Sequence, residues 1–249
     1  MYHKTEFIVL KRINYSDNHR ILTLLSPEKG KFTAIAKGTR SLTSKLALGI
    51  ELFCHSKGTF AEGKSMDVLT QVALVEYFAP LRQDFETISR ALYLLELCAT
   101  VAQEDHDQGD LFSLLLQTLD GLSRRIADST MLLYFFEMHL LSILGFQPQL
   151  YTCAQCVAPL TREVAEYAVT DHGIICKQCL FRTFPALDEY PLQRVSFEQL
   201  MRLQELQTME WADVCQPQSF LKEIRDLPGL FLSSVLGREM RTRQFFSSS

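Results

Sequence analysis

The stretch HRILTLLSPEKGKFTAIAKG, residues 19–38, decides the fold class of this chain. Two short runs rich in Ile, Leu, Thr and Phe, 19–26 and 31–38, flank S-P-E-K-G, where proline and glycine favour a tight turn. We therefore expect two antiparallel strands joined as a hairpin. Three further segments have the same texture: TEFIVLKRI (5–13), GIELFCHSKGTF (49–60) and MDVLTQVALVEYF (66–78). Five short strands within about 75 residues suit a small closed β-barrel of the OB-fold type.

The spacing of apolar residues changes after Pro80. Intervals of three and four residues predict an amphipathic helix with this proline in its first turn. Its apolar stripe consists of Phe85, Ile88, Leu92, Leu95 and Ala99.

Further helices are marked by their expected ends. Asp110 is placed to cap a second helix, and Ser129 to begin a third that ends near Gly145. The sequence SFEQ at 196–199 fits a capping box at the start of another helix. A helical body therefore follows the barrel directly, without a flexible linker.

Two C-x-x-C pairs, CAQC at 153–156 and CKQC at 176–179, are the strongest chemical signal. Cys153, Cys156, Cys176 and Cys179 can converge on one tetrahedral Zn²⁺, and such a site is structural because no position stays open for a catalytic water. Residues 166–169 and 173–175 are expected to form the hairpin of a zinc ribbon, with D-H-G as its turn. One zinc per chain would help to fold this small insert.

Other roles for cysteine and histidine are weaker. A redox-active C-x-x-C normally occurs singly in a thioredoxin-like setting, so redox or vestigial cysteines are the alternatives to zinc. Cys54, Cys98 and Cys215 lie among apolar residues and are expected in the core. His139 is interpreted as a helix residue, and His172 is the one conceivable substitute ligand.

These signals together predict an α+β chain with two domains. Residues 1–79 form an OB-fold β-barrel. Residues 80–249 form an all-α helical domain that carries the four-cysteine zinc ribbon at about 151–181.

Charge is distributed unevenly along the chain. Residues 1–80 carry a net charge of +4 and residues 81–249 carry –8. A bound polyanion is therefore expected mainly on the first part, although a merely solvated basic face is the alternative. The basic residues that fall close together there are Lys29, Lys31, Lys37, Arg40 and Lys45.

Residues 58–65, GTFAEGKS, match the phosphate-loop pattern G-x-x-x-x-G-K-[ST]. A nucleotide-hydrolysing fold alternates strands and helices, whereas this chain has strands first and helices afterwards. Glu62 would also repel phosphates. We therefore expect a turn between the last two barrel strands, no ATP and no enzyme, although a helix over 66–77 stays an alternative. Lys64 can still touch nucleic acid from that turn.

The location of the protein is expected to be cytoplasmic. The N-terminus lacks the apolar run of a secretory signal, and no apolar stretch approaches the roughly 18 residues of a membrane span. No membrane partner is expected.

Several stretches taken together resemble the RecO family of bacterial recombination mediators. They are IVLKRINYSDNHRILTLLSPEKGKF, AKGTRS, LTQVALVEYFAPLR, YLLELC, FFEMHLLSILGFQPQLYTCAQC and LGREMRTRQF. The resemblance implies an OB-fold that binds single- and double-stranded DNA and anneals complementary strands in the bacterial nucleoid. It also implies that the protein works with RecR to displace single-strand-binding protein so that RecA can load, with a functional link to RecF.

The resemblance extends to individual positions. Lys37, Arg40 and Lys45 fall in the family's basic stretch after the third strand, and the four cysteines match its zinc-bearing branch. Tyr134 and Phe135 stand where the family often has arginines that rim a pocket for the acidic tail of single-strand-binding protein. Other arginines that could supply this rim are Arg124, Arg125, Arg238, Arg241 and Arg243.

Three aromatic residues in the expected barrel allow two interpretations. Phe32, Phe53 and Phe60 could stack on bases or fill the barrel core. The rival to a DNA mediator is a factor for RNA or transcription that combines an OB-fold with a zinc ribbon.

Overall fold

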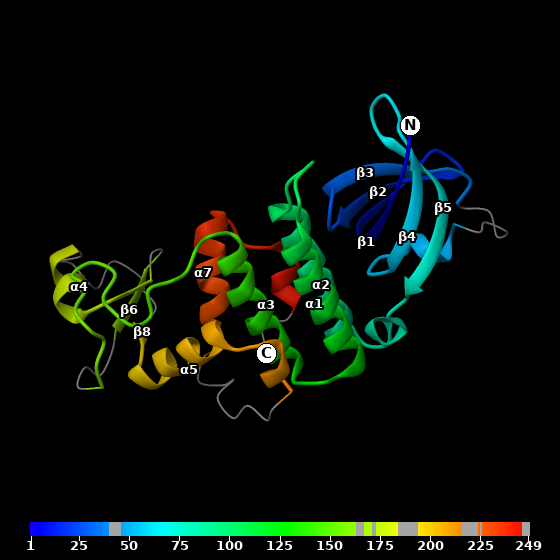
Figure 1. The fold of residues 1–249 in the computed structure, drawn as a ribbon. Helices are drawn as coiled ribbons and strands as arrows, with labels where there is room; N and C mark the ends of the chain where they lie inside the picture. The colour runs from blue at the N-terminus through cyan, green and yellow to red at the C-terminus, as the bar shows by residue number, and fades with distance from the viewer. Residues whose placement is uncertain are drawn as a thin grey trace. The chain divides into compact units, whose positions relative to one another are not determined.

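A computed structural model describes residues 1–39, 46–162, 167–170, 173–183, 194–215, 224 and 226–245. The chain forms two compact units, one of Met1–Ser129 with Met240–Ser249 and one of Thr130–Glu239. The barrel and the first two long helices lie in the first unit (Figure 1). The domain boundary expected after residue 79 thus falls at the end of the barrel, inside this unit, and it stays a prediction.

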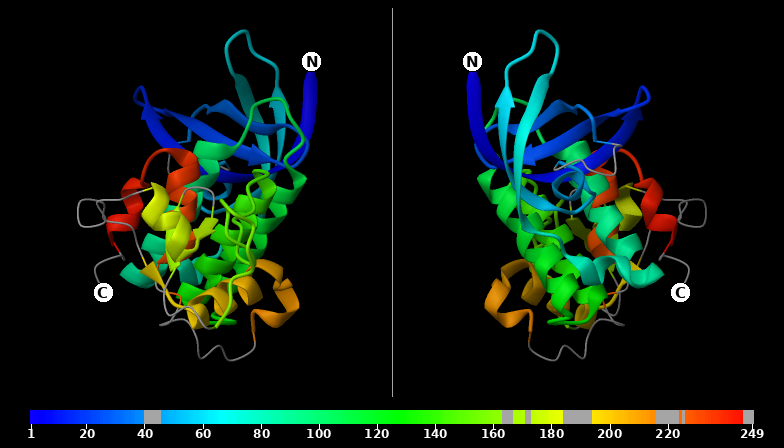
Figure 2. Two further views of the ribbon diagram at one scale, coloured as in Figure 1. Left: turned by 90° about the vertical axis from the view of Figure 1, so that its left-hand side faces the viewer. Right: turned by 90° about the vertical axis from the view of Figure 1, so that its right-hand side faces the viewer.

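Five strands close into a barrel in the order β1-β2-β3-β5-β4. β3 and β5 pair in parallel, at Ala34 with Asp67, and the other pairs are antiparallel. This confirms the five-stranded OB-fold, and Figure 2 shows the barrel from two further sides. The strands are β1 (Tyr2–Tyr15), β2 (His19–Ser26), β3 (Gly30–Ala36), β4 (His55–Ala61) and β5 (Asp67–Glu76).

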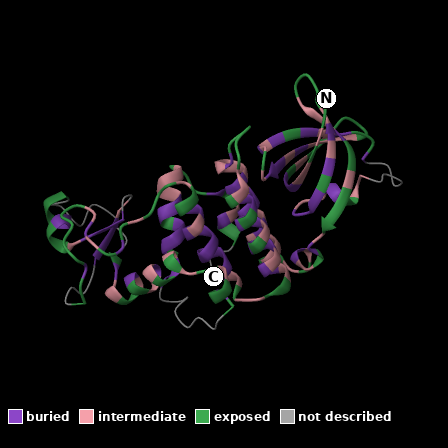
Figure 3. Ribbon diagram, viewed as in Figure 1, coloured by how far each residue is buried: buried purple, intermediate pink, exposed green. Residues whose placement is uncertain are grey.

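The barrel interior is filled by alternate residues of β1, β2 and β3, as the two-residue period of a strand requires, together with Phe60 of β4 and Leu69 of β5 (Figure 3). Phe32 and Phe60 pack edge to face in this core, with ring centroids 5.2 Å apart. Phe53 is also buried, at 2% exposure. The hypothesis that these three rings stack on bases is therefore wrong, because they fill the core.

Residues 49–54, expected to begin the fourth strand, do not form one. A 3-10 helix, η1 (Leu48–Ile50), precedes a turn in which Phe53 has a left-handed φ of 71°. The hydroxyl of Ser56 donates to the Gly49 carbonyl at 2.9 Å, which holds this turn against the start of β4. Ile50 and Phe53 are thereby buried, and this burial accounts for the departure from an extended strand.

The first unit also contains η2 (Ala79–Arg82), α1 (Phe85–Val101), α2 (Gly109–Arg124) and η5 (Arg241–Phe245). Pro80 lies in η2 and not in α1, whose N-cap is Asp84, which accepts from the Thr87 N–H at 2.7 Å. α2 begins one residue before Asp110, so that residue lies in the first turn and is not the cap.

The barrel packs on the connection between α1 and α2. The Lys31 N–H donates to the Gln103 carbonyl at 2.8 Å, and the Gln108 N–H donates to Pro27 at 2.7 Å. Gly30 makes this approach possible, because a Cβ at that position would lie 2.3 Å from the Gln103 oxygen. The hairpin of the sequence motif is thus also the contact that fixes the helices to the barrel.

The second unit is built around α3 (Ser129–Ile143), which is apolar and buried on most of its surface. Gly145, with φ of 80°, ends this helix as predicted, and Ser196 forms the predicted capping box with Gln199. His139 bonds to the Phe135 carbonyl and is a helix residue, as expected. The other elements are β6 (Tyr167–Thr170), β7 (Gly173–Ile175), α4 (Lys177–Thr183), β8 (Arg194–Val195), α5 (Phe197–Thr208), η4 (Trp211–Asp213) and α7 (Leu227–Leu236).

Within the described ranges, no helix combines the length and the apolar character that a bilayer crossing requires.

Candidate metal centre and nucleic-acid interface

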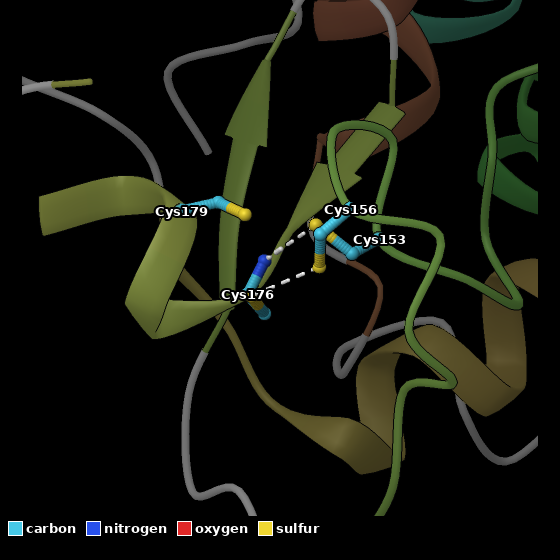
Figure 4. Close-up of side chains that lie close together, drawn as sticks. All are labelled: Cys153, Cys156, Cys176 and Cys179. Atoms are coloured by element: carbon cyan, nitrogen blue, oxygen red, sulfur yellow. Dashed lines mark hydrogen bonds between the residues drawn. The ribbon is translucent and has the colours of Figure 1, made fainter. Parts of the chain in front are cut away.

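Four cysteines meet in the second unit. Cys153 and Cys156 come from the segment that follows α3, Cys176 directly follows β7, and Cys179 lies in the first turn of α4 (Figure 4). Their four sulfurs all lie within 4.8 Å of one another, and the Cys156 and Cys176 sulfurs are 3.8 Å apart. A tetrahedral zinc with bonds of about 2.3 Å separates its sulfurs by about 3.8 Å. The cluster therefore fits one tetrahedral metal ion.

Local backbone turns orient the two cysteine side chains of each C-x-x-C pair toward the cluster. In the first pair, the Val157 N–H donates to the Cys153 carbonyl at 2.9 Å, and Val157 has a left-handed φ of 61°. In the second pair, the helix bond from the Leu180 N–H to the Cys176 carbonyl, 2.9 Å long, sets Cys179 one turn after Cys176. A C-x-x-C spacing thus places both sulfurs of a pair on one side of the chain.

The cluster is supported by the predicted hairpin. β6 and β7 pair antiparallel, with Ala168 opposite Ile175. The Ala154 N–H donates to the Ile174 carbonyl at 2.8 Å, which ties the first cysteine pair to β7. Strand β8, which the sequence analysis missed, pairs with β6 through two residues, too few to show a period. Asp171 and His172, the expected turn, lie outside the described residues.

Two of the thiols have strongly shifted pKa values. Burial raises the pKa of Cys153, but backbone N–H groups that point at its sulfur outweigh this effect and lower the value to about 6. One of them is the Cys176 N–H, 3.3 Å from the sulfur. Burial, followed by hydrogen bonds to the other three cysteines, raises the pKa of Cys179 to about 12. Convergent N–H groups around one thiolate are typical of a thiolate–metal site.

The remaining cysteines do not join this cluster. Cys54 and Cys98 are buried, as expected, and burial raises the pKa of Cys54 to about 11. Cys215 is exposed, so its assignment to the core was wrong. Its apolar neighbours in sequence do not surround it in the fold.

The GTFAEGKS segment joins two antiparallel strands. It runs through the end of β4, a short turn and the residues before β5. No helix follows Ser65, and residues 67–76 form a strand, so the alternative of a helix over 66–77 is excluded. The backbone N–H groups of a helix N-terminus, on which a phosphate loop depends, are therefore missing here. Lys64 is exposed in the turn.

The lysines predicted to bind DNA fall into two groups. Lys29 contacts Asp67, with Nζ 2.6 Å from Oδ2, and Lys31 donates to the Ala99 carbonyl at 3.0 Å. The ammonium groups of both lysines therefore have hydrogen-bond partners inside the first unit. Lys37 and Lys64 are exposed, and neither has an ion-pair partner in the described part of the chain. Arg40 and Lys45 lie outside the described residues.

The outer surface of β1, β2 and β3, which we call the β1–β3 face, carries further candidates that the sequence analysis missed. Pairing places Tyr15 opposite His19, and Lys11 opposite Thr23. A row of Ile13, Ile21 and Ile35 crosses the strands between these pairs. Lys11 and Tyr15 are exposed. No sequence motif marks them, because only the pairing register brings them to one face.

This face has the position that OB-folds use for oligonucleotides, between the β1–β2 turn and the β4–β5 turn. Lys37 follows the end of β3 next to the first turn, where the Thr39 N–H donates to the Asn18 carbonyl. Lys64 belongs to the second turn. Exposed cations thus stand at both ends of a face that carries one exposed aromatic ring.

The arginines considered for partner binding are placed differently from one another. Arg124 pairs with Asp120 at 2.8 Å, and Arg125 with Asp84 at 3.1 Å, and both are exposed. Arg238 and Arg241 are exposed, whereas Arg243 is 7% exposed and lies against Tyr93. Arg243 therefore offers little surface to a partner.

Two cavities are lined by residues that include, or lie close in sequence to, some of these arginines. One of about 470 Å³ in the first unit includes Arg125 but also the carboxylates of Asp84 and Glu86. One of about 190 Å³ in the second unit is lined mainly by apolar residues, among them Leu141 and Phe231. The two carboxylates make the first cavity unsuited to an acidic peptide.

Comparisons with known proteins agree with this architecture. The family model described as "Recombination protein O N terminal" matches residues 1–78, and "Recombination protein O C terminal" matches residues 82–244. A "DNA repair protein RecO" of Roseiflexus sp. (strain RS-1) is 33% identical over 98% of this chain and 84% of its own length. A protein of the same name from Symbiobacterium thermophilum is 34% identical over 69% of each chain. With two family models that together span nearly all of it, the chain belongs to the RecO family of DNA repair proteins.

Proposed function

We propose that this protein is a recombination mediator that binds single- and double-stranded DNA and anneals complementary strands without ATP. In this role it acts with RecR to help load RecA onto DNA coated with single-strand-binding protein, in a pathway linked to RecF. The observation that carries the proposal is the OB-fold barrel of a RecO family member, with exposed cations at both ends of its β1–β3 face.

The chemistry of the β1–β3 face suits binding without sequence preference. Lys11, Lys37 and Lys64 would neutralise phosphates and release counterions, so affinity falls as salt rises. Tyr15 offers one ring for stacking, whereas the row of isoleucines offers none. A strand held mainly by its backbone keeps its base edges free, and free edges are what pairing with a second strand requires.

The metal centre is proposed to hold one structural Zn²⁺ through Cys153, Cys156, Cys176 and Cys179. Bound zinc would join the segment after α3 to β7 and α4, and so stabilise a small ribbon built on short strands. With four sulfur ligands the ion has no open position. The function of this site is therefore to fold the ribbon.

A protein partner is proposed for the cavity beside Leu141 and Phe231. The acidic, phenylalanine-ending tail of single-strand-binding protein needs an apolar pocket with a cation at its rim. Arg238 is the best placed of the five arginines, because it follows α7, which supplies Phe231 and Val235 to this cavity. Arg238→Ala should weaken tail binding, while Arg124→Ala, at an exposed arginine of the first unit that pairs with Asp120, should not.

The decisive experiment is annealing of two complementary oligonucleotides coated with single-strand-binding protein, across a salt series and without ATP. We expect faster annealing that fades with salt. Lys37→Ala with Lys64→Ala should slow it, and Arg162→Ala with Arg202→Ala, a matched loss of charge in the second unit, should not.

Two other results would contradict the proposed function. Annealing that needs ATP would contradict the assignment of GTFAEGKS to a simple turn. Preference for RNA over single-stranded DNA would favour the rival factor for RNA or transcription.

A further inference from the structure

A groove on the other side of the barrel is not used by the face described above. It has a volume of about 410 Å³ and lies on the outer surface of β1, β4 and β5. Phe7 and Phe60 point into the core, so their strand neighbours of opposite parity point outward. We call this surface the β1–β4–β5 groove. Two of the strands that line it, β4 and β5, are drawn in cyan in Figure 1.

Two lysines stand in this groove on adjacent strands. Lys4 of β1 lies opposite Thr59 of β4, and Lys57 is two residues before Thr59 on the same surface. Diagonal neighbours of this kind are about 7–8 Å apart, a separation that two flexible lysines can match to neighbouring phosphates. Both are exposed, and neither makes an ion pair within the described ranges. Their positive charges are therefore available to a ligand.

The one carboxylate of the groove is already engaged. Glu6 lies opposite Lys57, but its Oε2 is 2.8 Å from Nε2 of the buried His55. This contrasts with Lys29, whose charge is offset by Asp67. With two lysines against one carboxylate, the groove therefore keeps a net positive charge.

Neutral residues in and beside the groove could also contact a nucleic-acid strand. Gln71 lies opposite Thr59 and can donate hydrogen bonds to phosphate or base oxygens. Tyr2, at the end of the same row of outward residues as Lys4, is 71% exposed, so its ring is open for stacking. Cations along a groove with an exposed aromatic ring are what proteins use to hold single strands without reading their sequence.

We propose that the β1–β4–β5 groove is a second track for single-stranded DNA, held by Lys4 and Lys57 and separate from the β1–β3 face. The inference rests on the proposed DNA-binding function. It adds that one barrel holds two strand segments at once. A mediator that brings strands together gains from this arrangement, because each strand is neutralised by its own lysines.

The test counts short strands bound per chain. Oligothymidylate of about eight nucleotides, the size of one OB-fold site, is titrated into the full chain, and stoichiometry is measured by native mass spectrometry and sedimentation. We expect two oligonucleotides per wild-type chain and one for Lys4→Ala with Lys57→Ala. Replacement of both by arginine should restore two. Lys37→Ala with Lys64→Ala should weaken the other track and leave the groove occupied.

The outcomes separate this inference from the proposed function. One oligonucleotide per wild-type chain, or two on the Lys4→Ala/Lys57→Ala variant with unchanged affinity, would overturn the second track and leave DNA binding intact. No binding to the wild type at any salt would overturn both. Because both lysines are exposed, the variant should keep the wild-type melting temperature, which confirms that lost binding is not lost folding.

Discussion

The ion pair with Asp67 reduces the positive charge that Lys29 presents to a phosphate. The Asp67 carboxylate lies 2.6 Å from the Lys29 ammonium, and its side chain is 12% exposed, so the contact is only partly screened by water. The ring of Phe32 lies 4.9 Å below the same ammonium. A basic residue counted in a sequence is therefore not the same as a basic residue available at a surface.

Replacement of Asp67 by asparagine should release that charge. We expect Asp67→Asn to bind single-stranded DNA more tightly at low salt and to increase the slope of log affinity against log salt by about one. Fluorescence anisotropy across a salt series measures both quantities. Asp105→Asn, an equal change of charge in the connection between α1 and α2, is the control. Equal slopes for Asp67→Asn and wild type would show that Lys29 does not reach DNA even when freed.

Gly30 offers a second prediction at a single residue. It has φ of +69°, and a Cβ would meet the Gln103 oxygen at 2.3 Å and the His106 oxygen at 2.7 Å. Gly30→Ala should therefore destabilise the first unit by more than about 1 kcal/mol, measured by thermal or urea unfolding. Gly38 has the same φ but no neighbour within 4 Å of a Cβ, so Gly38→Ala isolates backbone strain. If the two variants lose equal stability, the close approach to Gln103 contributes nothing.

At the scale of secondary-structure elements, a segment can be predicted from the sequence when residues close to it in the chain determine its structure. The hairpin of residues 19–38 and the two C-x-x-C knuckles depend on nearby residues, and both formed as expected. Residues 49–54 were misassigned because burial of Ile50 and Phe53 in the barrel outweighs their strand propensity. The β1–β4–β5 groove depends on a register among three strands, which no local pattern reveals.

The four-cysteine ribbon, with its proposed zinc, gives a prediction at the scale of secondary-structure elements. Cys179→Ser should lower metal content from about one zinc per chain to well below it, since the remaining three sulfurs form an incomplete tetrahedron. Elemental analysis of protein purified without chelator measures this content. Hydrogen exchange should rise in β6, β7 and α4 and stay unchanged in the barrel. Cys215→Ser, at an exposed cysteine outside the cluster, should keep its zinc. Absence of zinc from the wild type would remove the proposed site.

Metal binding should also depend on pH. Every ligand binds as thiolate, and burial raises the pKa of Cys179 to about 12, so that group must lose a proton to the solvent on binding near pH 7. The pKa of Cys153, lowered to about 6, means that it binds without such a loss until the pH falls below that value. Zinc affinity should therefore fall as pH decreases, and more steeply below about pH 6. A competition titration with a chromogenic chelator at several pH values would detect an affinity that fails to change.

At the scale of the whole molecule, the chain leaves its first unit after Ser129 and returns to it at Met240. Glu96 of α1 receives the returning segment. Its carboxylate accepts the N–H groups of Arg241 at 3.1 Å and Thr242 at 2.9 Å, and the Thr242 hydroxyl at 2.6 Å. One side chain thus fixes the point where the second unit ends and the first is completed.

Loss of this carboxylate should free the C-terminal segment while both units stay folded. We expect Glu96→Ala to raise hydrogen exchange and protease cleavage in residues 240–245, with the barrel protected as before. Burial raises the pKa of Glu96, but the hydrogen bonds from Thr242 and Arg241 outweigh this effect and hold the pKa below the usual value of a glutamate. The stability that this anchoring contributes is therefore fully present above the pKa of Glu96 in the unfolded chain, and it is lost as the pH falls through the lowered pKa of the folded protein. Glu239→Ala, at an exposed carboxylate just before the segment, is the control. Equal cleavage of the two variants would show that the anchor lies elsewhere, for example in the contact of Arg243 with Tyr93.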